Sequence, residues 1–163
     1  MGYTTDFLGA FVFAVALSEA QRDYINKFSA TRRMARNATL AAERPDPVRK
    51  AVKLPIGNQG GYFVGAEEYD MDDGAKDILD KNSPPSGQPG LWCKWEVTGD
   101  GANLQWNGHE KFHGYVEWLK YLIENFFKPW NKVLNGSVKW AGEEVSDAGT
   151  ITIKNNIVTT RRR

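Results

Sequence analysis

The 163-residue chain has little of several features that would point directly to a function. It has one cysteine, which excludes an internal disulfide framework and a cysteine-rich zinc site. Its formal net charge is +1, which argues against a strongly basic protein dedicated to nucleic acid. Its most apolar window, residues 7–17, is shorter than the roughly 20 residues of a membrane-spanning helix, and no basic residue precedes it. We therefore expect a cytoplasmic protein with neither a membrane segment nor a signal peptide.

Apolar residues, by contrast, are plentiful. Hydrophobic residues make up 41% of the sequence and charged residues 25%, so the chain can bury enough apolar surface to offset the entropy of ordering it. Six Trp, six Tyr and eight Phe provide a large aromatic contribution to one core. We expect a single domain over residues 1–160 and a basic arginine tail at 161–163.

Apolar residues recur with a period of two in several segments, which is typical of half-buried strands. These segments lie at residues 3–15, 91–97, 104–106, 138–140 and 151–158. Within the last one, Asn155-Asn156 suits a two-residue hairpin turn with positive φ. We expect the strands to form a mostly antiparallel sheet.

Two other segments have the helical spacing of apolar residues. One runs from Ser18, a helix N-cap, to about Arg36, and the other covers about residues 108–128. The stretch at 37–90, rich in Ala, Pro and Gly, predicts mostly loop. The predicted fold is α+β, with two amphipathic helices packed on one face of the sheet and a long irregular middle.

Charge is balanced in sum but segregated along the chain. Residues 21–53 contain nine Lys or Arg against three Asp or Glu, whereas residues 66–80 contain one against seven. The two segments either neutralise each other and are solvated, or they form surface patches of opposite sign for a charged partner.

The pattern closest to a catalytic motif is His109-Glu-Lys-Phe-His113, which matches H-E-x-x-H. In zinc peptidases this spacing places two imidazole ligands on one helical face, with the glutamate as general base. Glu143, in a stretch similar to the E-x-x-S-D of one such family, would be the third ligand. The alternative function is therefore a zinc-dependent hydrolase with Glu110 as its catalytic residue.

Two features favour a simpler interpretation of this segment. Asn107 would cap a helix whose third residue is Glu110, which accounts for the glutamate without catalysis. His109 and His113 would then lie on the flank of the helix rather than in a lined cleft. We favour a capped surface helix with no metal and no cofactor, over a weak metal site that would also use Glu117.

Arg32 and Arg36 are the best candidates for binding an anion. On a helix that reaches residue 36, both lie near the edge of the apolar stripe, whereas Arg33 points away from it. An arginine near a core needs an anion, because an unpaired buried charge is costly. That anion is either a carboxylate of this chain, for instance in the acidic stretch, or a phosphate or carboxylate of a partner.

Trp92 and Trp118 are candidates for a partner-binding surface. Trp92 falls on the outward face of its predicted strand, and Trp118 falls opposite the apolar stripe of the second helix. Exposed tryptophans anchor protein interfaces and can stack on bases. Alternatively, the long loops fold over them and complete a second small core.

Several segments resemble a small family of bacterial, phage and prophage proteins. They are TRRM at residues 31–34, PPSGQPGLWC at 84–93 and EKF at 110–112. The resemblance covers most of the chain apart from residues near 38–60. No activity is established for the family, so the resemblance implies no mechanism, and its phage members imply a host-interaction or anti-defence role only by association.

The sequence thus favours a non-enzymatic α+β binding module. It would bind a partner protein, or an anionic ligand such as a nucleotide or nucleic acid, through Arg32, Arg36, Trp92 and Trp118. The alternatives are the zinc hydrolase and a virion or assembly component carried by the exposed aromatic residues.

Overall fold

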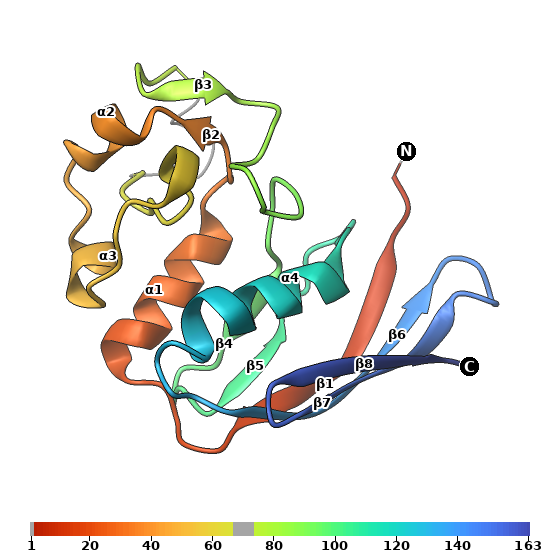
Figure 1. Ribbon diagram of the computed structural model, residues 1–163. Coiled ribbons are helices and arrows are strands. Elements are labelled where there is room, and N and C mark those ends of the chain that lie inside the picture. Colours follow the sequence, from red (N-terminus) through yellow and green to blue (C-terminus); the bar gives the residue numbers. More distant parts are fainter. Residues whose placement is uncertain (1, 67–73) are drawn as a thin grey trace. The chain divides into compact units, whose positions relative to one another are not determined.

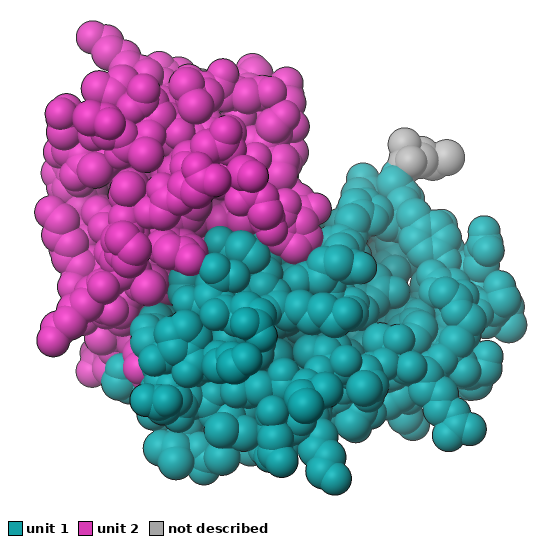
Figure 2. Space-filling model, viewed as in Figure 1, with its two compact units in different colours: residues 1–18, 94–163 teal, residues 19–93 magenta. Residues whose placement is uncertain are grey.

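The computed structural model describes residues 2–66 and 74–163, so residues 67–73 of the acidic stretch lie outside the described part. The chain divides into two compact units, residues 1–18 with 94–163 and residues 19–93 (Figure 2). The prediction of one domain over residues 1–160 did not include this division. The α+β class is confirmed. None of the described helices combines the length and the apolar character that a membrane crossing requires.

The described residues of the first unit form a six-stranded antiparallel sheet in the order β4-β5-β1-β6-β7-β8 (Figure 1). The strands are β1 (Thr5–Phe13), β4 (Trp95–Val97), β5 (Asn103–Trp106), β6 (Leu134–Gly142), β7 (Ala148–Lys154) and β8 (Ile157–Arg162). Each corresponds to a predicted strand, although several bounds differ. The central strand β1 pairs with β5 on one side and β6 on the other, so the sheet joins the two ends of the chain.

One face of this sheet carries the core of the first unit. Phe11 of β1 and Val138 of β6 are fully buried, as expected for side chains that alternate between the two faces of a strand. Helix α4 (Tyr115–Leu122) lies against this face (Figure 1), and the rings of Tyr115 and Trp140 are 6.3 Å apart. We call this the inner face and the opposite one the outer face.

The second predicted helix is shorter than residues 108–128. Helix α4 begins at Tyr115, directly after Gly114 with φ of 66°, and is followed by the π-helical turn η2 (Ile123–Phe127). Lys111 also has a positive φ, 61°. Because residues in the left-handed region cannot continue a right-handed helix, the segment before Gly114 is irregular.

The β7–β8 hairpin confirms the predicted turn. Asn155 and Asn156 have φ of 48° and 68°, as a two-residue turn with two left-handed positions requires. The Asn156 side chain also accepts the Leu134 N–H at 2.7 Å and donates to the Lys132 carbonyl at 3.0 Å. These bonds connect the hairpin to the start of β6.

The arginines at the end of the chain are not a tail, contrary to the prediction. Arg161 and Arg162 belong to β8 and lie opposite Thr150 and Gly149 of β7. The Arg163 N–H donates to the Ala148 carbonyl at 2.8 Å. The prediction failed because it ended the strand where the apolar residues end, whereas backbone hydrogen bonds continue it.

The second unit consists of short elements that accompany α1 (Glu19–Ala30). They are β2 (Ala35–Arg36), α2 (Ala38–Ala42), α3 (Pro47–Ala51), η1 (Asn58–Gly60) and β3 (Ile78–Asp80), and β2 pairs antiparallel with β3. Loops connect them, as predicted for residues 37–90, but the prediction included none of α2, α3 or β3.

Helix α1 ends at Ala30 rather than at Arg36. The Thr31 hydroxyl donates to the Lys27 carbonyl at 2.6 Å, in the last turn of the helix. Beyond it, the Arg33 N–H donates to the Leu91 carbonyl and the Ala35 N–H to the Ser83 carbonyl, both at 2.8 Å. These bonds to residues distant in the sequence replace helical ones, which the apolar periodicity cannot reveal.

Candidate anion-binding site

The H-E-x-x-H residues do not lie on a helix. His109 and His113 precede α4, so the spacing that would align two imidazoles on one helical face is lost. The Asn107 side chain accepts the His109 N–H at 3.0 Å in a local turn rather than capping a helix. Glu143 accepts the Thr4 N–H at 2.7 Å. Residues 2–66 and 74–163 contain no group of three side chains placed to hold a metal, so this zinc site is not formed by them.

The predicted anion-binding arginines lie in the second unit, in a different arrangement from the one expected. Arg36 is 2% exposed and its guanidinium contacts the Asp77 carboxylate at 2.9 Å, so its anion is internal and comes from the acidic stretch. Arg32 is half-buried and donates to the Lys81 carbonyl at 3.1 Å. Both expectations assumed a helix that reaches residue 36, and that helix ends earlier.

Arg33, expected to point away from the core, is 2% exposed. Its guanidinium donates to the carbonyls of Phe63 at 2.9 Å and Gly61 at 2.8 Å. It also contacts the Gln88 side chain at 3.3 Å, and Gln88 itself donates to the Gly61 carbonyl. Parts of the TRRM and PPSGQPGLWC segments thus hold the loops of the second unit together.

The two tryptophans differ from the exposed anchors that were predicted. Trp118 is fully buried, and its ring lies 5.5 Å from that of Tyr121. The prediction assumed that one face of the helix is covered, but Trp118 and its neighbour Leu119 are both inaccessible to solvent. Trp92 is half-buried. A buried Trp118 cannot serve as a surface contact.

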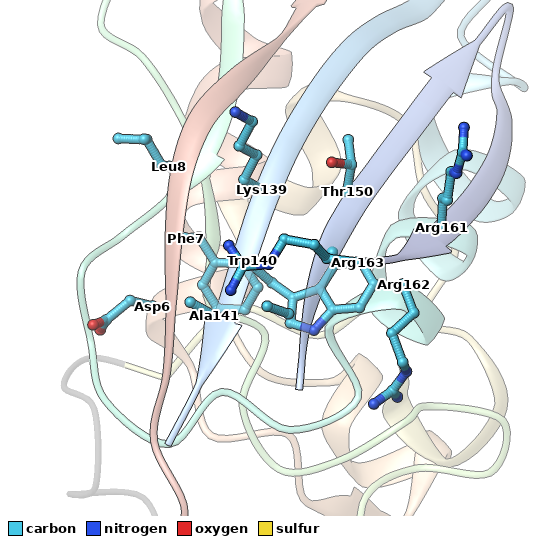
Figure 3. Close-up of a pocket in the computed structure, with 12 residues that line it drawn as sticks. Asp6, Phe7, Leu8, Lys139, Trp140, Ala141, Thr150, Arg161, Arg162 and Arg163 are labelled. Carbon is cyan, nitrogen blue, oxygen red and sulfur yellow. The ribbon is translucent and has the colours of Figure 1, made fainter. Parts of the chain in front are cut away.

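The outer face of the first unit presents a row of side chains that crosses four strands. The sheet register places Leu8 opposite Lys139, Lys139 opposite Thr150, and Thr150 opposite Arg161. Figure 3 shows these four side chains pointing to the same side from β1, β6, β7 and β8. Leu8 is 74% exposed, so the row faces solvent.

A second row, two residues along each strand, makes a hollow beside the first. Asp6 lies opposite Ala141, Ala141 opposite Ala148, and Ala148 accepts the Arg163 N–H. The alanine side chains are short, whereas the neighbouring side chains of Lys139, Arg161 and Arg163 are long. A groove of about 650 Å³ results, lined by both rows and by Phe7, Trp140, Gly149 and Arg162 (Figure 3).

The charge of this basic groove is strongly positive. Among its lining residues, Lys139, Arg161, Arg162 and Arg163 are cationic and Asp6 alone is anionic. Lys139, Arg161 and Arg163 make no side-chain ion pair or hydrogen bond with any residue that the structure describes. Their charges face solvent and can meet an external anion without first breaking an internal pair.

Arg162 has a different role from its neighbours. It lies on the other side of β8, 66% exposed, with its guanidinium 3.9 Å from the Asp147 carboxylate. Asp147 accepts the Trp140 indole N–H at 2.9 Å and the Tyr3 hydroxyl at 2.8 Å. These two hydrogen bonds hold the pKa of the Asp147 carboxyl below its ordinary value, with a smaller contribution from Arg162. Asp147 thus holds the indole of Trp140, which packs near Tyr115 on the inner face of the sheet.

The arrangement can bind an anion that is long enough to contact several cations. A guanidinium recognises carboxylate and phosphate oxygens through two parallel hydrogen bonds, and the Thr150 hydroxyl adds another donor. The sequence contained a signal for this site. The alternation of apolar and polar residues along the strand puts Lys139 on the face opposite to Val138 and Trp140. Extending the last predicted strand to its arginines would have placed Arg161 beside it.

Comparisons with protein-family models, with curated proteins and with solved structures found no match for this chain.

Proposed function

We propose that the protein is a non-enzymatic binding module and that the basic groove of its first unit holds an anionic part of a partner. The observation that carries the proposal is the gathering of Lys139, Arg161 and Arg163 around one groove, where no carboxylate of residues 2–66 or 74–163 pairs with them. If these charges served only the stability of the protein, we would expect each to pair with a carboxylate of the chain, as Arg36 pairs with Asp77.

The groove takes over the role first predicted for Arg32, Arg36, Trp92 and Trp118. The class of interaction is unchanged, since both versions recognise an anion through basic side chains. The resemblance to phage and prophage proteins supports a host protein as the partner, in a host-interaction or anti-defence role. Binding through exposed charges weakens as salt rises, which gives the proposal a measurable signature.

The proposal is tested with three anions of different kinds: tripolyphosphate, a single-stranded oligonucleotide and a peptide that contains three consecutive acidic residues. Affinity is measured by calorimetry at low and physiological salt. We expect at least one anion to bind, with an affinity that falls about tenfold or more when Lys139, Arg161 and Arg163 are all changed to Gln.

The matched control carries the same loss of charge elsewhere. Lys50, Lys120 and Lys128 are exposed and lie outside the groove, so their change to Gln should alter affinity less than twofold. If both triple variants weaken binding equally, the attraction is due to net charge and the groove is not the site. If none of the three anions binds at low salt, the proposed function is wrong.

A further inference from the structure

The groove borders an open edge of the sheet. Among the described strands, β8 pairs with β7 on one side and with no strand on the other. Five of its six residues are exposed and Val158 is half-buried. The opposite edge is different, because β4 has three residues, of which Trp95 and Val97 are buried. An unpaired strand edge is a template for another extended chain.

The register shows which backbone groups of β8 are free to pair. The Arg163 N–H donates to the Ala148 carbonyl, which makes these two a hydrogen-bonded pair. Such pairs alternate along an antiparallel ladder, so Arg161 and Thr159 also direct their N–H and C=O groups toward β7. The backbone N–H and C=O groups of Val158, Thr160 and Arg162 therefore point away from β7, toward the open edge of the sheet.

The side chains along this edge change in character from one end to the other. At one end, Arg161 and Arg163 lie on the outer face beside the groove and Arg162 lies on the inner face. At the other end, Ile157 is 67% exposed and Val158 is half-buried. An added strand would therefore meet cations on both of its faces near Arg162 and apolar groups near Ile157.

We infer that β8 is a docking edge for an extended acidic segment of a partner protein, which adds to the sheet as an antiparallel strand. Its carboxylates lie beside Arg161, Arg162 and Arg163, and its β-branched or apolar residues lie beside Ile157 and Val158. In an antiparallel addition the acidic residues come first in the segment. The inference rests on the proposed function, and it names the partner as a polypeptide.

The backbone of the edge distinguishes a polypeptide from a nucleic acid. Val158, Thr160 and Arg162 offer alternating N–H donors and C=O acceptors, spaced for another β-strand. A deoxyribose–phosphate backbone carries acceptors that match the cations but has no hydrogen-bond donors that match the carbonyls. A β-strand therefore satisfies both the charges and the backbone, whereas single-stranded DNA satisfies the charges alone.

The test uses the blocked peptide Glu-Asp-Glu-Val-Thr-Val-Thr and two N-methylated forms of it, in which alternate sets of amides are methylated. We expect the unmodified peptide to bind. One N-methylated form should lose affinity at least tenfold and the other should keep it, because only one set of amides can face β8. All three peptides have the same charge, so a purely ionic attraction predicts equal affinities.

A variant of the protein provides the complementary measurement. Thr160→Pro removes an N–H that points away from the sheet and leaves the ladder to β7 intact, which is where a strand tolerates proline. Thr160→Pro should lower the affinity for the unmodified peptide at least tenfold. Thr160→Ala retains the N–H, so its affinity for that peptide should stay within twofold of that of the parent protein. Tripolyphosphate should bind the Pro variant as it binds the parent protein, because the groove is unchanged.

The outcomes separate this inference from the proposed function. Equal affinities for the two N-methylated peptides overturn strand addition even if the Pro variant fails to fold. Tight binding of tripolyphosphate or the oligonucleotide, together with no binding of the peptide, also overturns strand addition and leaves the proposed function standing. Loss of all binding at low salt overturns both.

Discussion

Asp77 pairs with the buried Arg36 and the half-buried Arg44 of the second unit, so its replacement should strongly destabilise that unit. Asp77 is 3% exposed, and its two carboxylate oxygens lie 2.9 Å from the guanidinium groups of Arg36 and Arg44. Asp77→Asn leaves one acceptor oxygen and places an NH₂ donor against the other guanidinium. Because Arg36 is itself 2% exposed, its guanidinium would stay buried and would lose the counter-charge that Asp77 provides. Breaking such a pair costs about 3–5 kcal/mol, out of a total of about 5–15 kcal/mol for a typical domain.

Urea denaturation measures this cost, and two observations assign it to the second unit. Trp92 is the tryptophan that the sequence places in residues 19–93, so a variant with Phe at the other five Trp positions would report on that unit. Hydrogen exchange measured by mass spectrometry gives the same assignment without those substitutions. Glu19→Gln is the control, because Glu19 is 82% exposed and lies 3.8 Å from Arg22, a pair worth at most about 1 kcal/mol. A loss below about 1 kcal/mol for Asp77→Asn would refute the reasoning.

Three further predictions concern the first unit. Because the pKa of Asp147 is lowered in the folded state, its contribution to stability is present above its unfolded pKa and is lost as pH falls through the folded value; Asp147→Asn should therefore destabilise at neutral pH, and the difference from the parent protein in urea midpoints should shrink in acid. Asn156→Gly suits the turn but removes the two side-chain hydrogen bonds to the start of β6, so we expect a net loss of about 1 kcal/mol, and a gain in thermal midpoint would contradict this. Asp6→Asn removes the single carboxylate among the lining residues of the groove and should raise tripolyphosphate affinity severalfold, whereas Asp100→Asn, outside the groove, should not.

The features that could be predicted from the sequence are those set by local patterning. Two-residue alternation located the strands of the sheet, and Asn155-Asn156 specified its turn because few residue types accept positive φ at both positions. The fold class follows from these local patterns.

The features that could not be predicted depend on contacts between distant residues. Helix α1 ends at Ala30, and beyond it the Arg33 N–H donates to the Leu91 carbonyl instead of continuing the helix. The spacing of apolar residues in 18–36 does not indicate that bond. Because the prediction extended α1 to residue 36, it turned Arg33 away from the core, whereas Arg33 is 2% exposed. The groove was missed for a related reason, since its arginines belong to a strand held by backbone pairing rather than by apolar residues.

The pairing of β1 with β5 and β6 has a consequence for the order in which the chain can fold. The partners of β1 begin at Ala102, so residues 5–13 leave the ribosome long before the segments that hydrogen-bond to them in the sheet are made. The second unit is contiguous and is synthesised within that interval. Residues 19–93 can therefore reach their native contacts while Phe7, Phe11 and Phe13 are still exposed. The pairing of β1 with β5 and β6 is then a late step that joins residues distant in the sequence.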